Sequence, residues 1–155
     1  MLLTRLIKGG ASSSLLYNKL EMEVSNMIPK FKAWDKIDKV IREVTAIDWS
    51  LDLVEFMHGA NERSFENVIL LQSTGLKDKS SVEIYEGDIV SVRNHPFQKT
   101  ELSGVGIEID GDYLIGWSDH NLTWLAGDLL LYQLKPYIEV IGNIYENPEL
   151  LEVQR

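Results

Sequence analysis

Three carboxylates lie close together in the sequence, at Glu83, Glu86 and Asp88, and are the first candidates for metal binding or acid–base chemistry. A hard divalent cation needs several converging oxygen ligands. Gly87 lies among them and favours a turn with positive φ, in which Asp88 can accept hydrogen bonds from the backbone amides of its own turn. We therefore interpret the group as a structural turn and predict neither a metal ligand nor a catalytic carboxylate there.

A second acidic group, Asp110-Gly111-Asp112 with Asp119 downstream, resembles the start of a calcium-binding loop. The loop of that type ends with a bidentate glutamate at its twelfth position, which is held here by Asn121. Asp-Gly between two apolar segments is instead typical of a hairpin turn. The sequence therefore predicts a hairpin and no calcium site.

The remaining reactive side chains form no recognisable catalytic or binding pattern. His58, His95 and His120 share no metal-ligand spacing, and each lies in a predicted loop. The chain has no cysteine, which excludes disulfides, thiolate metal sites and cysteine nucleophiles and is compatible with a reducing cytosol. Gly104 and Gly106 lack the following helix that a phosphate-binding loop requires. We expect no catalytic residue, no cofactor and no metal, and hence a protein that is not an enzyme.

Composition indicates one soluble globular domain. The 155 residues are 45% hydrophobic and 25% charged, which is enough for a hydrophobic core and argues against global disorder. The net charge is −9, and residues 27–155 alone carry −10, so phosphate backbones should be repelled and nucleic acid is an unfavoured partner. No apolar run approaches the roughly 20 residues that span a bilayer, so we expect no membrane association and a cytoplasmic location.

The first half of the sequence predicts strands. Residues 28–35 alternate apolar and polar side chains and have Pro29 near their start, which predicts an edge strand. Residues 40–47 are rich in β-branched side chains and predict the returning strand, although residues 36–46 also fit a helical spacing. Residues 47–53 alternate strictly, with a phase slip at Val54 that suggests a bulge. The apolar residues expected on one face there are Ile47, Trp49, Leu51 and Leu53.

The second half continues the same pattern. Turns at Gly75 and Gly87 lead into a strand over residues 89–93, and a polar loop follows over residues 94–103. Two strands, residues 104–109 and 113–117, flank the predicted Asp-Gly hairpin. Further strands are expected over residues 122–125 and 137–144, and a strand or one helical turn over residues 129–134. Asn147 before a proline predicts a short terminal helix. Many short strands separated by turns indicate an all-β sandwich or barrel.

Four blocks of this sequence occur in a recognisable order: Ile28-Pro-Lys-Phe-Lys-Ala-Trp-Asp35, Leu71-Gln-Ser-Thr-Gly-Leu-Lys-Asp78, Glu83-Ile-Tyr-Glu-Gly-Asp-Ile-Val90 and Val140-Ile-Gly-Asn-Ile-Tyr-Glu-Asn147. Together they resemble the signature blocks of the YopX family of small phage and prophage proteins. The resemblance covers about residues 27–151 and implies a mainly β protein: an SH3-like small β-barrel, with its core at about 71–147, additional N-terminal strands and a short C-terminal helix. It implies no known activity. The signature positions that should fix turns are Gly75, Asp78, Tyr85, Gly87, Asp88, Gly142, Asn143 and Tyr145.

Residues 1–26 lie outside the resemblance and differ in composition from the domain expected over residues 27–155. One hypothesis is that Met27 is the functional start and that the preceding residues are dispensable. The alternative is an arm that packs on a neighbouring subunit.

The patterning favours a protein-interaction module over other functions. We expect a homo-oligomer, in which exposed edge strands pair, or a complex with a phage or host protein. The alternation predicts that Trp49 and Trp117 point inward, which leaves Trp124 as the candidate interface residue. Residues 94–135 match the family weakly, so a partner-specific surface is expected there. The alternative function is a nucleic-acid-associated accessory role in phage replication or regulation, which would need a local basic face.

Overall fold

The computed structural model describes residues 29–100, 102 and 104–152. The chain is mainly β, with two antiparallel sheets and a few short helical turns. The predicted N-terminal segment 1–26 and the proposed start at Met27 lie outside the described residues. No helix among those residues has the length and apolar character needed to cross a membrane.

Six strands form the first sheet, in the order β4-β3-β2-β1-β5-β6. Every pair of neighbours is antiparallel. A single-turn 3-10 helix, η2 (Phe65–Asn67), precedes β5. The strands are β1 (Phe31–Asp35), β2 (Val40–Asp48), β3 (Leu53–Phe56), β4 (Asn61–Ser64), β5 (Val68–Lys77) and β6 (Glu83–Tyr85).

Five strands form the second sheet, in the order β10-β9-β8-β7-β11. A short helix, α3 (Leu131–Leu134), and the 3-10 turn η3 (Lys135–Tyr137) connect β10 to β11. The predicted terminal helix is α4 (Glu149–Glu152), which follows Pro148. The strands are β7 (Asp88–Val92), β8 (Gly111–Ser118), β9 (Thr123–Ala126), β10 (Leu129–Leu130) and β11 (Ile138–Asn143).

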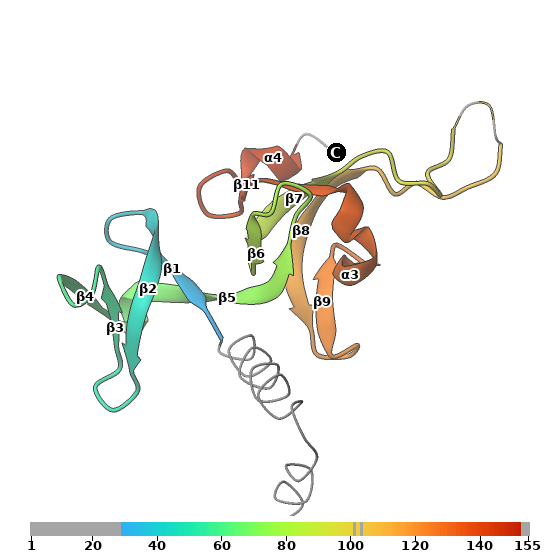
Figure 1. Ribbon diagram of the computed structural model, residues 1–155. Coiled ribbons are helices and arrows are strands. Elements are labelled where there is room, and N and C mark those ends of the chain that lie inside the picture. The colour runs from blue at the N-terminus through green and yellow to red at the C-terminus, as the bar shows by residue number, and fades with distance from the viewer. Residues whose placement is uncertain (1–28, 101, 103, 153–155) are drawn as a thin grey trace, which may run out of the picture.

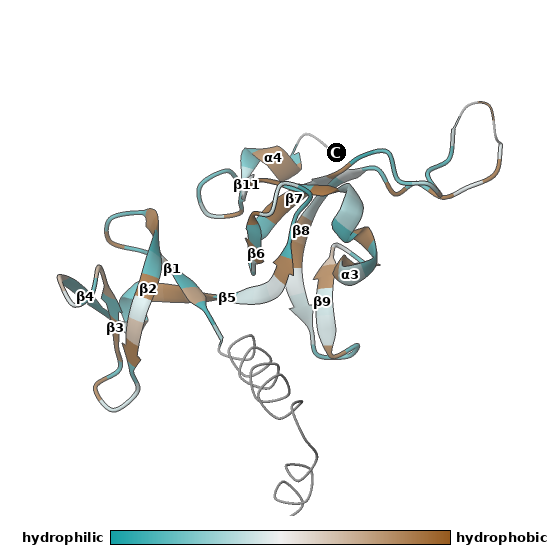
Figure 2. Ribbon diagram, in the orientation of Figure 1, coloured by the Kyte–Doolittle hydropathy of each residue, from teal (hydrophilic) through white to brown (hydrophobic). Residues whose placement is uncertain are grey.

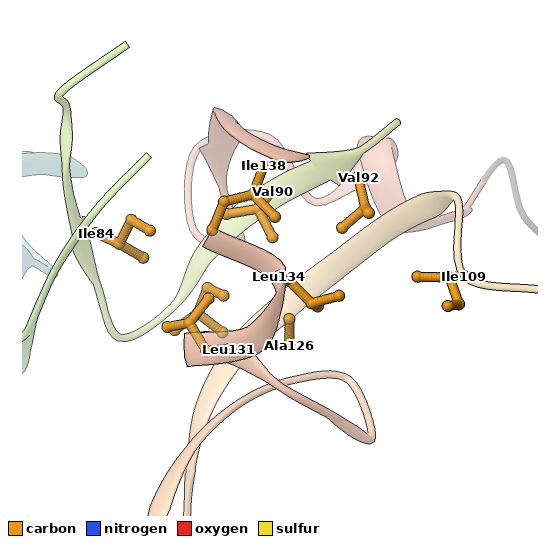
Figure 3. Packing of buried hydrophobic residues seen from close by; sticks show 9 residues of the cluster. Ile84, Val90, Val92, Ile109, Ala126, Leu131, Leu134 and Ile138 are labelled. Atoms are coloured by element: carbon orange, nitrogen blue, oxygen red, sulfur yellow. The ribbon is translucent and has the colours of Figure 1, made fainter. Parts of the chain in front are cut away.

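Each sheet has its own hydrophobic core, and β5 runs from one to the other (Figure 1). The smaller core lies between β1, β3 and β5, and its buried members are Ala33, Val54, Phe56 and Val68. The larger core lies between β6 and the second sheet, with α3 inserting two leucines, as Figure 3 shows. Its buried members are Ile84, Val90, Val92, Ile109, Ile115, Ala126, Leu131, Leu134 and Ile138.

Several predicted strands are confirmed. Residues 40–47 lie in β2, so the strand prediction for them is correct and the helical alternative is wrong. The prediction that residues 28–35 form an edge strand is wrong, because β1 pairs with β2 on one side and with β5 on the other. Pro29 precedes β1 and therefore removes no donor from either ladder.

Three predicted features of the middle of the chain are also wrong. Residues 49–52 form a turn instead of continuing the alternation, because the Asp48 side chain accepts the backbone N–H groups of Ser50 (2.8 Å) and Leu51 (3.1 Å). The bulge lies in β2 between Val44 and Ala46, not at Val54. The expected Asp-Gly hairpin is absent from the described residues, because β8 pairs with β7 and β9. The described strands form two sheets without a closed barrel.

Candidate interaction surfaces

The turn at Glu86, Gly87 and Asp88 joins three parts of the fold. The backbone N–H of Tyr85 donates to Oδ2 of Asp88 (2.8 Å). The N–H of Gly87 donates to the carbonyl of Ile115 in β8 (3.0 Å), and the Gly87 carbonyl accepts from Ile144 (2.9 Å). Gly87 has φ +81°, and a Cβ there would lie 3.2 Å from the Tyr145 ring. These contacts make the turn a structural junction between β6, β8 and the end of β11.

Asp78 joins the turn before β6 to β11. Its buried carboxylate accepts the backbone N–H groups of Ser80 (2.8 Å), Val82 (2.9 Å) and Val140 (3.0 Å). A carboxylate that accepts three backbone donors needs no further ligand. The predicted turn at Gly75 is wrong, because Gly75 lies within β5, at φ +74° in a bulge between Ser73 and Lys77.

The residues after β11 form the third of these joints. The Asn143 side-chain oxygen accepts the N–H groups of Tyr145 (3.0 Å) and Glu146 (2.9 Å). Gly142 has no space for a side chain, since a Cβ would lie 2.6 Å from Oδ1 of Asn147. Tyr145 then stacks on Trp34 of β1, so the signature positions gather where the two sheets meet.

The acidic candidates do not converge on one point. Glu83 accepts from Ser73 Oγ (2.7 Å) and pairs with Lys30 (3.4 Å), and the Ser73 hydroxyl is the main reason that the pKa of Glu83 lies below its usual value. Burial raises the pKa of Asp88 to about 6, against the opposing effects of the Tyr85 N–H and the Lys32 charge. The described residues contain no group of three side chains suited to a metal ion.

The second acidic group and the histidines are likewise separate. Asp110 accepts the backbone N–H groups of Asn94 (2.9 Å) and His95 (3.1 Å), whereas Asp112 pairs with Arg93 (2.9 Å). The His95 ring packs edge-on against Tyr137, with centroids 4.9 Å apart. Asn121, His58 and His120 are exposed. None of these residues forms a catalytic pair with another.

The tryptophans are placed differently from the prediction. Trp49 is 68% exposed in the turn after β2, and Trp117 is 46% exposed near the end of β8, beyond the part that covers the core. Trp117 and Trp124 face each other across the β8–β9 ladder and pack edge-to-face, with centroids 5.2 Å apart. Trp124 is half-buried and packs against the larger core. The predicted interface residue therefore contributes to a surface pair with Trp117.

Exposed apolar side chains also occur on the segment between β7 and β8, residues 94–110 without 101 and 103, which projects from the body (Figure 1). We call this segment the arm. Hydrophobic residues recur along it (Figure 2), and they are 71% exposed at Phe97, 100% at Leu102 and 60% at Ile107. Sequence reasoning treated the first half of the arm as a polar loop, although Phe97 and Leu102 within it were a signal of an exposed apolar surface.

Hydrogen bonds fix the base of the arm. The Gln98 side-chain oxygen accepts the backbone N–H groups of Ile109 and Asp110, each at 2.6 Å. The Tyr113 hydroxyl donates to the carbonyl of Ile109 (2.6 Å), whose side chain lies in the larger core. Asp110 therefore closes the base of the arm by bonding back to residues 94 and 95, which explains why it does not turn a hairpin into β8.

The two sides of the arm are also joined farther out. The Lys99 N–H donates to the Ile107 carbonyl (3.0 Å), and the Ile107 N–H donates to the Phe97 carbonyl (3.2 Å). Gly106 has φ +138°, and a Cβ there would lie 2.9 Å from the Lys99 Cα, so only glycine permits this approach. The arm is thus an organised element that holds apolar side chains away from the core.

A groove of about 660 Å³ lies at the start of β1 and is bordered by residues 29–31 and 43–47. Trp49, Glu83 and Tyr85 complete its lining. Burial, with the charge of Glu83 as a further cause, raises the pKa of Tyr85 to about 12, so its hydroxyl is neutral at physiological pH. The groove therefore offers aromatic surface beside carboxylates.

Comparison with known proteins identifies one family and a related structure. The sequence model of the family described as YopX protein matches residues 30–152. The crystal structure of protein EF1440 from Enterococcus faecalis is 32% identical, with a TM-score of 0.53, and the match covers 80% of this chain and 98% of that one. No curated protein matches the chain.

Proposed function

The chain belongs to the YopX family, and from this membership we propose that it is a phage- or prophage-encoded, non-enzymatic interaction module that assembles with copies of itself in the cytoplasm of a bacterial host. The observation that carries the proposal is the arm. An apolar side chain held in water forgoes about 1.5–3 kcal/mol of burial free energy, and the arm exposes several of them on a hydrogen-bonded base. Such a surface is typical of a binding site whose partner covers it.

Preorganisation distinguishes the arm from an ordinary long loop. Binding through a disordered loop would cost the entropy of ordering it, whereas the bonds at Gln98, Lys99 and Tyr113 have already restricted the backbone. The apolar side chains can therefore be buried with less loss of freedom. Self-association through the arm replaces the edge-strand pairing of residues 28–35 that the sequence suggested.

We assign the SH3-like barrel to the second sheet together with β6 and the end of β5, within about residues 71–147. Two contacts support this assignment, because they bridge the turn before β6 to β11 beyond the regular ladders. The Lys79 N–H donates to the Ile138 carbonyl (3.0 Å), and Asp78 accepts from Val140 (3.0 Å). The barrel then serves as a rigid body from which the arm projects.

Charge argues against the nucleic-acid alternative. Residues 27–155 carry −10, and the arm itself contains one lysine and no arginine. Phosphate binding depends on several Lys or Arg contacts. A fluorescently labelled DNA duplex or RNA strand should show no change in anisotropy with the protein, even at low salt; binding that weakens steeply with salt would restore this alternative.

The test of self-assembly is the mass of the full chain in solution. Light scattering after size exclusion should give a discrete multiple of the 17.7 kDa chain. Phe97→Ser combined with Ile107→Ser should reduce that mass, since both side chains are exposed and neither is needed for a core. Tyr132→Ser is the matched control, because Tyr132 is an equally exposed apolar residue (74%) outside the arm, and it should leave the mass unchanged. A monomer for the unmodified chain would contradict the proposal.

A further inference from the structure

A hollow of about 310 Å³ lies beside the tryptophan pair of the second sheet, where the end of β5 passes β8 (Figure 1). We call it the indole pocket. A volume of this size is at the lower end of the range for ligand sites. The pocket shares no lining residue with the groove or with the arm. Four separate elements supply its lining: Gln72 of β5, Glu86 of the turn before β7, Trp117 of β8 and Trp124 of β9.

The walls of the indole pocket are held in place by contacts within the fold. Trp117 and Trp124 are directly opposed in the β8–β9 ladder, and their rings pack at 71° with centroids 5.2 Å apart. Nε1 of Trp117 also donates to Oδ1 of Asp119 (3.0 Å), which orients the indole. The other two lining residues are joined by the backbone N–H of Glu86, which donates to the Gln72 carbonyl (2.9 Å). Binding there would require little further ordering of the protein.

The polar side chains of the pocket have no partner of their own. Among the described residues, the Glu86 carboxylate and the Gln72 amide form no hydrogen bond and no ion pair. No lysine or arginine lines the pocket, and within the same part of the chain no cation lies over either indole ring. The pocket therefore presents an uncompensated negative charge beside two aromatic rings.

This combination selects for a cation of a particular shape. The face of an indole attracts cations more strongly than that of any other side-chain ring. A guanidinium group suits the site better than an ammonium group, because it is planar, stacks on aromatic rings and donates two parallel hydrogen bonds to a carboxylate. An apolar ligand would bury the Glu86 charge without a counterion, and an anion would be repelled by it.

We propose that the indole pocket binds the guanidinium group of an arginine side chain on a partner protein. The planar group lies against the indoles, pairs with the Glu86 carboxylate and donates a further hydrogen bond to the Gln72 side-chain oxygen. Such a side chain would bring together the three kinds of surface that line the pocket. An arginine seated beside tryptophans is also the composition that most often dominates the energy of a protein interface.

The arginine belongs to a different protein and not to a second copy of this chain. The described residues contain three arginines, and each already forms an ion pair: Arg42 and Arg63 with Asp35, and Arg93 with Asp112. Withdrawing Arg42 or Arg63 would leave the fully buried Asp35 carboxylate with one partner fewer. The indole pocket thus adds a second interaction site to the self-contact assigned to the arm, and it does not depend on that contact.

The experiment titrates the full-length protein with a capped tripeptide that has one central arginine. The indole N–H resonances of Trp117 and Trp124 in nitrogen-15 NMR spectra should shift and saturate, whereas that of Trp49, which is exposed in the first sheet, should not. The same tripeptide with citrulline has nearly the same shape without the charge. It should bind about tenfold more weakly, the change expected on losing a charged hydrogen bond. Equal affinity for the two peptides would overturn the proposal.

Two variants test the protein side of the contact. Glu86→Gln retains the shape of the side chain and removes its charge, and Trp117→Leu removes an exposed ring; each should weaken binding of the arginine peptide about tenfold. Glu62→Gln is the matched control, because it removes the same charge from an exposed residue outside the pocket, and it should have no effect. The Trp34 and Trp49 resonances report whether each variant is folded. Unchanged affinity in both pocket variants would show that the peptide binds elsewhere on the acidic surface.

Two further measurements decide which molecule supplies the arginine. Arg5 and Arg155 lie outside the described residues, so the chain with Arg5→Gln and Arg155→Gln should bind the peptide with unchanged affinity. Tighter binding would show that an arginine of this chain occupies the pocket, against the proposal. Light scattering should give Glu86→Gln the same mass as the unmodified chain. A lower mass would place the pocket in the self-contact and overturn the assignment to a different protein, whereas a monomeric unmodified chain that still binds the peptide would contradict self-assembly alone.

Discussion

Trp34 and Tyr145 stack face to face, with ring centroids 5.5 Å apart and an interplanar angle of 21°. Trp34 belongs to β1 in the first sheet, and Tyr145 follows β11 in the second. The adjacent Glu146 also accepts the backbone N–H of Ile41 (3.3 Å). The stack is therefore a side-chain connection between two sheets that otherwise have separate cores.

A double-mutant cycle should measure this connection. Trp34→Leu and Tyr145→Leu should each lower the free energy of unfolding, and together they should lower it less than the sum of the two. The expected coupling is about 0.5–1.5 kcal/mol, which is typical of an aromatic pair beyond its buried area. Urea titrations followed by circular dichroism give the four free energies. Additive effects would show that the stack does not couple the sheets.

Three glycines should differ in their tolerance of alanine. Gly116 has ordinary φ and open space at its Cβ position, so Gly116→Ala should be neutral or slightly stabilising. Gly75→Ala should cost about 1–2 kcal/mol, because φ is +74° although the space is open. Gly87→Ala should cost more, since it adds a contact with the Tyr145 ring at 3.2 Å to the same backbone strain. Thermal denaturation of the three variants would give this order; an equal cost for Gly75 and Gly87 would show that the Tyr145 ring moves freely aside.

The features that sequence reasoning predicted correctly are those with local causes. The turn at Gly87 and Asp88 and the helix after Pro148 depend on residues within a few positions of each other. The central position of β1 depends on its pairing with β5, about 40 residues away, and alternation cannot reveal a second neighbour.

The arm was missed for a related reason. Val105, Ile107 and Ile109 alternate as a half-buried strand does, but only Ile109 reaches the core, because the chain leaves the body beyond it. The alternation therefore predicted a strand over residues 104–109 that the structure does not form. Trp49 is a different case, because the sequence around it carries a local turn signal. Asp48 followed by Ser50 is typical of a turn, and this signal could have excluded an inward Trp49 side chain.

Removing Asp35 should strongly destabilise the first sheet. Its fully buried carboxylate accepts from Arg42 (3.1 Å) and Arg63 (3.1 Å). Burial raises the pKa of Asp35, but the backbone N–H groups of Asp38 and Ile37 and the two guanidinium groups outweigh it, so the pKa lies below its usual value. Asp35→Ala leaves two arginines without their buried partner and should cost about 3–5 kcal/mol.

Asp38 provides the matched control for that variant. It binds the same two arginines, at 2.5 and 2.9 Å, but its side chain is 45% exposed. Asp38→Ala should therefore cost about 1 kcal/mol or less. Denaturant titrations at one pH compare the two, and similar costs would show that solvent replaces Asp35 as easily as Asp38.

Asp88 should reduce stability as the pH rises from about 4 to 6. Its pKa is raised by burial from 3.8 to about 6 in the folded protein, so the folded state holds a proton that the unfolded state has already released. Below pH 4 both states are protonated, and Asp88 carries no electrostatic penalty. Above pH 6 both are ionised, and the penalty of burying the charge is complete, at about 2–3 kcal/mol for a shift of this size.

Asp88→Asn isolates this effect, because asparagine retains an oxygen for the Tyr85 N–H and cannot ionise. The free energy of unfolding of the variant, minus that of the unmodified chain, should be constant below pH 4, rise between pH 4 and 6 and then level off. The difference removes the opposite contribution of groups such as Glu83, whose lowered pKa stabilises the fold as the pH rises. Lys32→Met should extend the rise in the Asp88→Asn comparison to higher pH while its start stays near pH 4, since the Lys32 charge lowers the pKa of Asp88 in the folded protein alone. Denaturant titrations at half-unit pH steps give the curve, and a difference independent of pH from 4 to 7 would mean that Asp88 is hydrated well enough to ionise at its ordinary pKa.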